Sequence, residues 1–361
     1  MIVQEITLVI YASFEILVLS LLLLQKKYRK YFLILLYLFI IVIFLGLKEG
    51  DYHDFVLYKK MFYDADVSNI SIYPEISYIF LSVLFKSLGL DFYFLTLTYY
   101  TLLAIFLYKA ISISTIYREY AFLYFILFPI FFLSGYIAMR QIVAISIFFY
   151  SILYFNQKGK FPFALFLMAC LFHYSAILAY FIYFIFHKLI NRRFKMYVYL
   201  MLIAAAIGFS FYFKELMFTI FPYLPPLLSR YIYYLSSGQE VKLLRIIFYS
   251  FLYFVILILF SYTKENNNKI TNLMFNMYTI GNIISLFGIT DMNVNRFANY
   301  FMVFVITLLP NLLFSKNSRI SKDLRIIIFY VLTLLLSVYY YYGVLAVPDV
   351  FLTYQNILFS R

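Results

Sequence analysis

Long apolar runs separated by short polar loops make up most of this chain. A helix needs about 20 predominantly apolar residues to cross the hydrocarbon core of a bilayer. Hydrophobic residues account for 65% of the sequence and charged residues for only 12%, which a soluble domain could not accommodate. The sequence therefore predicts an all-α polytopic membrane protein. The clear spans are roughly 6–24, 31–47, 92–113, 119–137, 140–156, 196–213, 243–262, 270–289, 296–314 and 325–343.

Two further apolar stretches, 74–90 and 161–187, are ambiguous. With them, we expect about 11–13 transmembrane or re-entrant helices. No internal repeat, low-complexity tract or soluble domain is evident, so residues 1–361 are expected to form a single integral membrane domain.

Basic residues cluster in loops that mark the cytoplasmic side. One cluster, at 26–30, follows the first span, which places the N-terminus outside. External segments are then expected at about 48–91 and 214–242. In the preferred topology 74–90 lies along the outer surface, and 161–187 is a hairpin with a break near His173-Tyr-Ser175. In the alternative 74–90 spans the membrane, 161–187 crosses once, and Arg140 moves to the cytoplasmic side.

Four arginines meet the outer side in the preferred topology, each beginning or adjoining an apolar span. They are Arg140, Arg230, Arg245 and Arg296. Each could be an interfacial anchor whose stem snorkels to the headgroups. Outer-face arginines are disfavoured by the positive-inside rule, so four together favour an anion site. A guanidinium grips phosphate through a planar fork of donors, which indicates a lipid phosphate or pyrophosphate.

Few other polar residues suggest chemistry. His173 lies in an apolar run, where a core role competes with that of a proton carrier. Asp54 begins a segment in which Tyr58 and Phe62 recur at helical spacing, which predicts an interfacial amphipathic helix. Glu75 follows a proline at the start of an apolar stretch, as in ordinary helix capping.

Metal and nucleic-acid partners are not expected. The three histidines are far apart, and one cysteine, Cys170, allows no cysteine-based cluster. The net charge of +13 comes mostly from short loops between spans, so it reflects membrane topology rather than nucleic-acid binding. No cofactor is expected.

Several short elements together resemble the EpsG/Wzy family of polysaccharide polymerases, which extend O-antigen, capsule or exopolysaccharide chains. Lys48 occupies the position of an arginine in the family's first loop, Phe55 replaces a tyrosine, and Thr353 replaces a late proline. The matching elements are Asp54, Phe55, Tyr58 and Phe62; Pro74-Glu75 with Tyr78; Met139-Arg140-Gln141 with Ala144; Phe172-His173-Tyr174-Ser175-Ala176; Arg296 with Tyr300-Phe301 and Pro310; and Tyr354-Gln355.

The resemblance implies a fold related to the lipid-linked (GT-C type) glycosyltransferases. It also implies glycan substrates on undecaprenyl diphosphate and a multi-pass protein of the bacterial inner membrane with its active site facing the periplasm. Membrane lipids and a chain-length regulator protein are the other expected partners. Candidate catalytic residues are then Arg140, Arg296, His173, Asp54 and Glu75. Candidate pyrophosphate-binding residues are Arg140, Arg296, Arg230, Arg245 and Lys48.

Three other functions fit a membrane protein of this kind. A flippase for the same lipid-linked unit is usually longer and built on internal repeats, which are not evident here. An O-antigen ligase performs the same chemistry with a lipid A acceptor, and a membrane O-acyltransferase modifies the glycan. We expect the polymerase reaction to be independent of metal, because the carboxylates are scattered along the chain.

Overall fold

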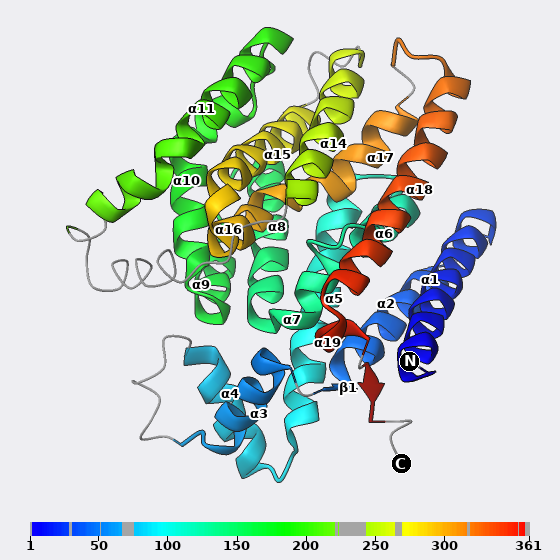
Figure 1. Cartoon of the computed structure of the whole chain (residues 1–361), viewed down its shortest axis with the longest axis vertical. Helices are drawn as coiled ribbons and strands as arrows, with labels where there is room; N and C mark the ends of the chain where they lie inside the picture. Colours follow the sequence, from blue (N-terminus) through cyan, green and yellow to red (C-terminus); the bar gives the residue numbers. More distant parts are fainter. Residues whose placement is uncertain are drawn as a thin grey trace. The chain divides into compact units, whose positions relative to one another are not determined.

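The computed structural model describes residues 2–28, 31–50, 52–66, 76–220, 223, 243–263, 269–315, 318–352 and 354–357. These residues form helices and one short two-stranded sheet (Figure 1). Within the described residues, the helices long and apolar enough to span a membrane are α5 (Phe92–Ser114), α8 (Met139–Lys158), α11 (Met196–Ile220), α14 (Leu243–Ser261) and α18 (Lys322–Ala346). The prediction of an all-α polytopic membrane protein is confirmed.

Bent and shorter helices supply further apolar segments. α16 (Met292–Met302) and α17 (Val305–Phe314) are bent by 46° and together are long enough to count as one span. Apolar helical stretches of fewer than 18 residues lie in α1 (Ile2–Tyr28), where the stretch is Thr7–Leu21, and in α2 (Tyr31–Gly46), α4 (Ile76–Ser87), α9 (Phe163–Phe172) and α10 (Ser175–Ile190).

The span predicted over 119–137 is broken in two. α6 (Arg118–Leu127) ends before Phe128, and α7 (Phe132–Ile137) begins four residues later. Phe128 has an extended backbone (φ −84°, ψ 106°). A residue before a proline is disfavoured in the helical region, and Pro129 itself has no backbone N–H to donate. Pro129 therefore explains the break, which the apolar pattern alone conceals.

The chain divides into two compact units. The first comprises Met1–Tyr180 and Ile327–Arg361, and the second comprises Phe181–Ile326. In the first unit α5 packs along α8 and along α2, and α8 also packs along α9. α8 is the most enclosed of the long apolar helices, with 72% of its apolar window buried against 17% for α18. The helix that carries Arg140 is thus firmly held.

A two-stranded antiparallel sheet joins distant parts of the first unit. β1 (Lys48–Glu49) follows α2, and β2 (Gln355–Asn356) follows α18 and the short helix α19 (Pro348–Phe351). Lys48 lies opposite Asn356 in the ladder. The N–H of Ile357 donates to the carbonyl of Leu47 over 3.0 Å, which extends the pairing by one bond.

The predicted amphipathic helix is present as α3 (His53–Tyr63). Phe55, Tyr58 and Phe62 are buried on its inner face, while Val56 and Leu57 are exposed. α3 and α4 lie together at the first turns of α5 (Figure 1). α4 has 12 residues, so its length is about 18 Å, which is too short to cross a core of about 30 Å.

The predicted break at His173-Tyr-Ser175 is also present. α9 ends at Phe172, His173 is extended (φ −157°), and α10 begins at Ser175. The rings of Phe166 and Tyr180 lie 4.9 Å apart, centroid to centroid. In one straight helix they would be about 21 Å apart. α9 and the first turns of α10 therefore form a hairpin with its apex at His173.

Two glycines allow close packing within the second unit. α15 (Lys269–Phe287) and α16 are joined by the 3₁₀ turn η3 (Gly288–Thr290). A Cβ on Gly281 would lie 2.7 Å from the backbone nitrogen of Met302, and one on Gly288 would lie 2.7 Å from that of Asn295. The backbones can approach this closely only because both positions lack a side chain. Most of the predicted external segment 214–242 lies outside the described residues.

Candidate functional site

Arg140 is the second residue of α8. Its side chain is half-buried, and its guanidinium carbon lies 4.9 Å from the ring centroid of Tyr58 and 5.5 Å from that of Tyr78. The Tyr78 hydroxyl donates to the Tyr58 carbonyl over 2.6 Å, which ties α4 to α3. Cation–π contacts of this kind orient a guanidinium. The two rings therefore hold the guanidinium of Arg140 close to the positive end of the α8 dipole.

Lys48 is enclosed by three tyrosines, and its side chain is only 3% exposed. The amine lies 3.9 Å from the ring centroid of Tyr136 and 5.5 Å from those of Tyr52 and Tyr100. It donates a hydrogen bond to the Tyr100 hydroxyl over 3.2 Å. Burial lowers the pKa of Lys48 well below its ordinary value, and the negative charge of Asp54 partly offsets this. We call Lys48 and the three tyrosines, Tyr52, Tyr100 and Tyr136, the lysine cage.

The lysine cage fixes the backbone that leads into α8. The Tyr100 hydroxyl donates to the carbonyl of Gly135 over 2.8 Å. The Tyr52 hydroxyl donates to the carbonyl of Tyr136 over 3.1 Å. Both acceptors lie within five residues of Arg140. Because buried carbonyls are costly to leave without a partner, these bonds hold the start of α8 in one place.

The apex of the α9–α10 hairpin lies against α4. The Ser77 hydroxyl donates to the Leu171 carbonyl over 2.6 Å, and the rings of Phe172 and Tyr99 are 5.0 Å apart. Tyr99 in turn packs on Tyr78, at 6.1 Å. His173 is half-buried at this apex. It therefore belongs to the same end of the first unit as Tyr78, one of the two rings beside Arg140.

Asp54 and Glu75 are the remaining predicted catalytic residues of the first unit. Asp54 is in the first turn of α3, half-buried, and close enough for its charge to act on Lys48. Glu75 lies outside the described residues. Arg140, Lys48, Asp54 and His173 are thus gathered at one end of this unit, around α3, α4 and the start of α8.

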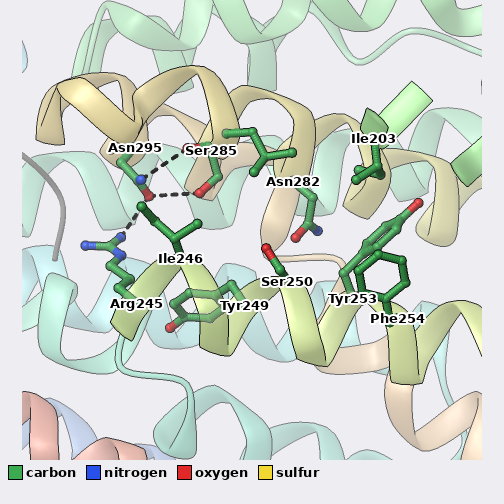
Figure 2. A pocket seen from close by; sticks show the side chains of 11 residues that line it. Ile203, Arg245, Ile246, Tyr249, Ser250, Tyr253, Phe254, Asn282, Ser285 and Asn295 are labelled. Atoms are coloured by element: carbon green, nitrogen blue, oxygen red, sulfur yellow. Dashed lines mark hydrogen bonds between the residues drawn. The ribbon is translucent and has the colours of Figure 1, made fainter. Parts of the chain in front are cut away.

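The second unit holds a separate polar cluster (Figure 2). Arg245, in the first turn of α14, donates from Nη2 to Oδ1 of Asn295 over 3.0 Å. The Ser285 hydroxyl donates to the same oxygen over 3.1 Å, and Asn295 Nδ2 donates to the Ser285 carbonyl over 3.3 Å. These three residues line a pocket together with Asn282 and Ser250.

Arg296 is half-buried on α16 and follows Asn295 in the chain. Asp291 caps this helix, accepting from the backbone N–H groups of Asn293 and Val294. Arg230 lies outside the described residues. Because Arg140 belongs to the first unit and Arg296 to the second, an anion site that includes both arginines stays a prediction.

Sequence reasoning missed the partners that position the charges. Tyr52, Tyr100 and Tyr136 were not singled out among the 40 tyrosines of the chain. Asn295 and Ser285, which bind Arg245, were also missed. Asn295 directly precedes the candidate Arg296 in an apolar region. A polar residue at this position is the sequence signal that could have indicated its role.

The chain matches the model of the EpsG family over residues 30–356. It belongs to the EpsG family. This is a family of polysaccharide polymerase-like membrane proteins, so the resemblance seen in the sequence is confirmed. The EpsG match runs from α2 to β2 and includes both strands of the sheet and the entire lysine cage. No curated protein and no solved structure matches the chain.

Proposed function

We propose that this EpsG-family protein is a glycan polymerase acting at the outer face of the bacterial inner membrane. The donor is a growing chain on undecaprenyl diphosphate, and the acceptor is a single repeat unit on the same lipid. A hydroxyl oxygen of the acceptor attacks the anomeric carbon of the donor. The bond between that carbon and the diphosphate oxygen breaks, and undecaprenyl diphosphate leaves with the bonding electrons.

The observation that carries this proposal is the placement of Arg140. Negative charge develops on the departing diphosphate, and preorganised donors aimed at that charge stabilise the transition state. Arg140 begins a deeply packed helix, and its guanidinium is oriented by the rings of Tyr58 and Tyr78. We assign the same role, stabilisation of the departing diphosphate, to Arg296, Arg245 and Arg230. Lys48 is assigned it too, although its cage must open before the amine can reach an anion.

A base would accept the proton of the attacking hydroxyl. His173 is the first candidate because an imidazole titrates near neutral pH and because it lies at the apex beside α4. Asp54 and Glu75 follow. Positioning of the two substrates alone can also supply a large part of the rate. Membrane lipids and a chain-length regulator are the proposed partners.

The test is the glycan pattern of a deletion strain complemented with variants. The deletion is expected to keep single capped repeats and to lose the ladder of longer chains, whereas loss of a flippase or ligase leaves no capped repeat. Arg140→Ala is expected to fail to restore the ladder although it inserts normally, and Arg140→Lys to restore it in part, because an ammonium lacks the bidentate fork.

A matched control is Lys109→Ala, which removes an exposed cation on α5 and is expected to restore the full ladder. A normal ladder from well-expressed Arg140→Ala would overturn the assignment of this arginine. Loss of capped repeats in the deletion strain would overturn the polymerase function itself.

A further inference from the structure

A wide groove runs between α1 and α2 of the first unit, with a volume of about 1010 Å³. Its walls are apolar and include Leu17 and Phe39, while its end is formed by Tyr354, Gln355 and Asn356 around β2. The volume is at the upper limit of the range of about 300–1,000 Å³ typical of small-molecule pockets. The groove is therefore large enough for a substantial ligand.

The groove has the polarity of a membrane lipid. Phe39 lies seven residues before the end of α2 at Gly46, so the apolar wall continues for roughly 10 Å below the polar end. The side chains of Leu17 and Phe39 are 46% and 60% exposed. An exposed apolar side chain on an apolar helix of a membrane protein is suited to contact with lipid. A hydrocarbon chain can enter sideways, with its polar group at the end formed by β2.

The polar end of the groove is connected to the lysine cage through one ring. Tyr354 stacks on Phe44 with centroids 4.5 Å apart, and its ring lies 6.1 Å from that of Tyr136. Tyr136 is the residue whose ring lies 3.9 Å from the Lys48 amine. The rings of Tyr354 and Tyr136 thus lie between a headgroup at this end of the groove and the Lys48 amine.

We propose that the groove binds the isoprenoid tail of a lipid-linked glycan and so delivers its diphosphate to the Lys48–Arg140 end of the unit. This inference rests on the proposed function and adds the place where the lipid is held. Lipid tails are as apolar as leucine, so the tail gains little from the hydrophobic effect when it leaves the bilayer. The groove instead packs against the tail and orients the lipid. Orientation serves a lipid that carries a reacting sugar, and a phospholipid carries none.

Photo-crosslinking tests this proposal independently of turnover. The full-length protein is reconstituted in vesicles of phosphatidylethanolamine and phosphatidylglycerol with a polyprenyl diphosphate that carries a diazirine on its tail. We expect labelled peptides from α1 and α2, and we expect unlabelled polyprenyl diphosphate to compete whereas excess phosphatidylglycerol does not. Labelling spread evenly over the lipid-facing helices, or equal competition by phospholipid, would overturn the proposal.

Filling the groove provides the matched variants. Leu17→Trp and Ile43→Trp add bulk to its walls and are expected to reduce labelling several-fold. Leu334→Trp, at a side chain of α18 that is 65% exposed and does not line the groove, is expected to leave labelling unchanged. Unchanged labelling in both groove variants counts against the proposal. If the polymerase function fails, wild-type protein makes no ladder but is still labelled in the groove; if the groove fails, the ladder forms and the label lies elsewhere.

Discussion

Removing the hydroxyl of Tyr100 should cost more stability than removing an ordinary buried tyrosine hydroxyl. Tyr100 is fully buried, accepts from the Lys48 amine and donates to the Gly135 carbonyl. Tyr100→Phe removes both hydrogen bonds, so the Lys48 amine and the Gly135 carbonyl stay buried and lose these partners. A neutral hydrogen bond contributes about 0.5–1.5 kcal/mol, and one to a charged group about 1.5–3 kcal/mol. The expected loss in the free energy of unfolding is therefore about 2–4 kcal/mol.

The measurement is reversible unfolding of the purified protein in mixed micelles, with Tyr37→Phe as the control. Tyr37 is equally buried, but its hydroxyl makes one neutral hydrogen bond, to the Phe122 carbonyl over 2.8 Å, so Tyr37→Phe should cost about 0.5–1.5 kcal/mol. In a Lys48→Met background the amine is gone, and Tyr100→Phe should cost about 1.5–3 kcal/mol less than in wild type. An equal cost in both backgrounds would refute the coupling between the lysine cage and the start of α8.

Three further predictions concern glycine substitutions in the second unit, the pKa of Lys48 and the role of metal ions. Gly281→Ala should destabilise the protein by about 1–3 kcal/mol, because its Cβ meets the backbone of Met302; Gly208→Ala, with nothing within 4 Å, should stabilise it by about 0.5–1 kcal/mol in the same unfolding assay. Burial lowers the folded-state pKa of Lys48 below the unfolded value of about 10.4, so the unfolded state binds more protons between the two values. Stability should therefore fall as pH falls through the folded-state pKa, and a pH series should show this dependence weakened in Lys48→Met. Polymerisation by purified protein should continue in excess chelator, and a complete, magnesium-reversible loss would contradict the expected metal independence.

The helical membrane fold could be predicted because apolar run length reports bilayer thickness directly. The break at His173 could be predicted from charge. Basic residues flank 161–187 on both sides, so both ends of this segment are expected on the cytoplasmic side, and the chain must turn back within it. The break at Pro129 was not predicted, since Phe128-Pro-Ile-Phe-Phe reads as uninterrupted hydrocarbon. The β1–β2 pair was also beyond prediction, because two-residue strands have no periodicity to detect.

The charged residues of the site were easier to predict than their surroundings. Arg140 stands out because a cation is rare in an apolar run. Lys48 was found only through its place in a family pattern, and nothing in the sequence indicates that it is buried at 3% exposure. The rings that enclose it come from α5, from the end of α7 and from the residue before α3. Such a convergence depends on tertiary packing, which a single sequence does not report.

The pairing of β1 with β2 has a consequence for biosynthesis. Membrane helices are made and inserted from the N-terminus, but the ladder partner of Lys48 is Asn356, which is made about 300 residues later. The segment that holds the lysine cage in register therefore cannot be completed until α18 and α19 have been made and the chain has reached β2. A chain truncated before β2 would retain its early helices and lack the strand that pairs with β1. The register of β1 is thus set late in synthesis, long after Lys48 itself has been made.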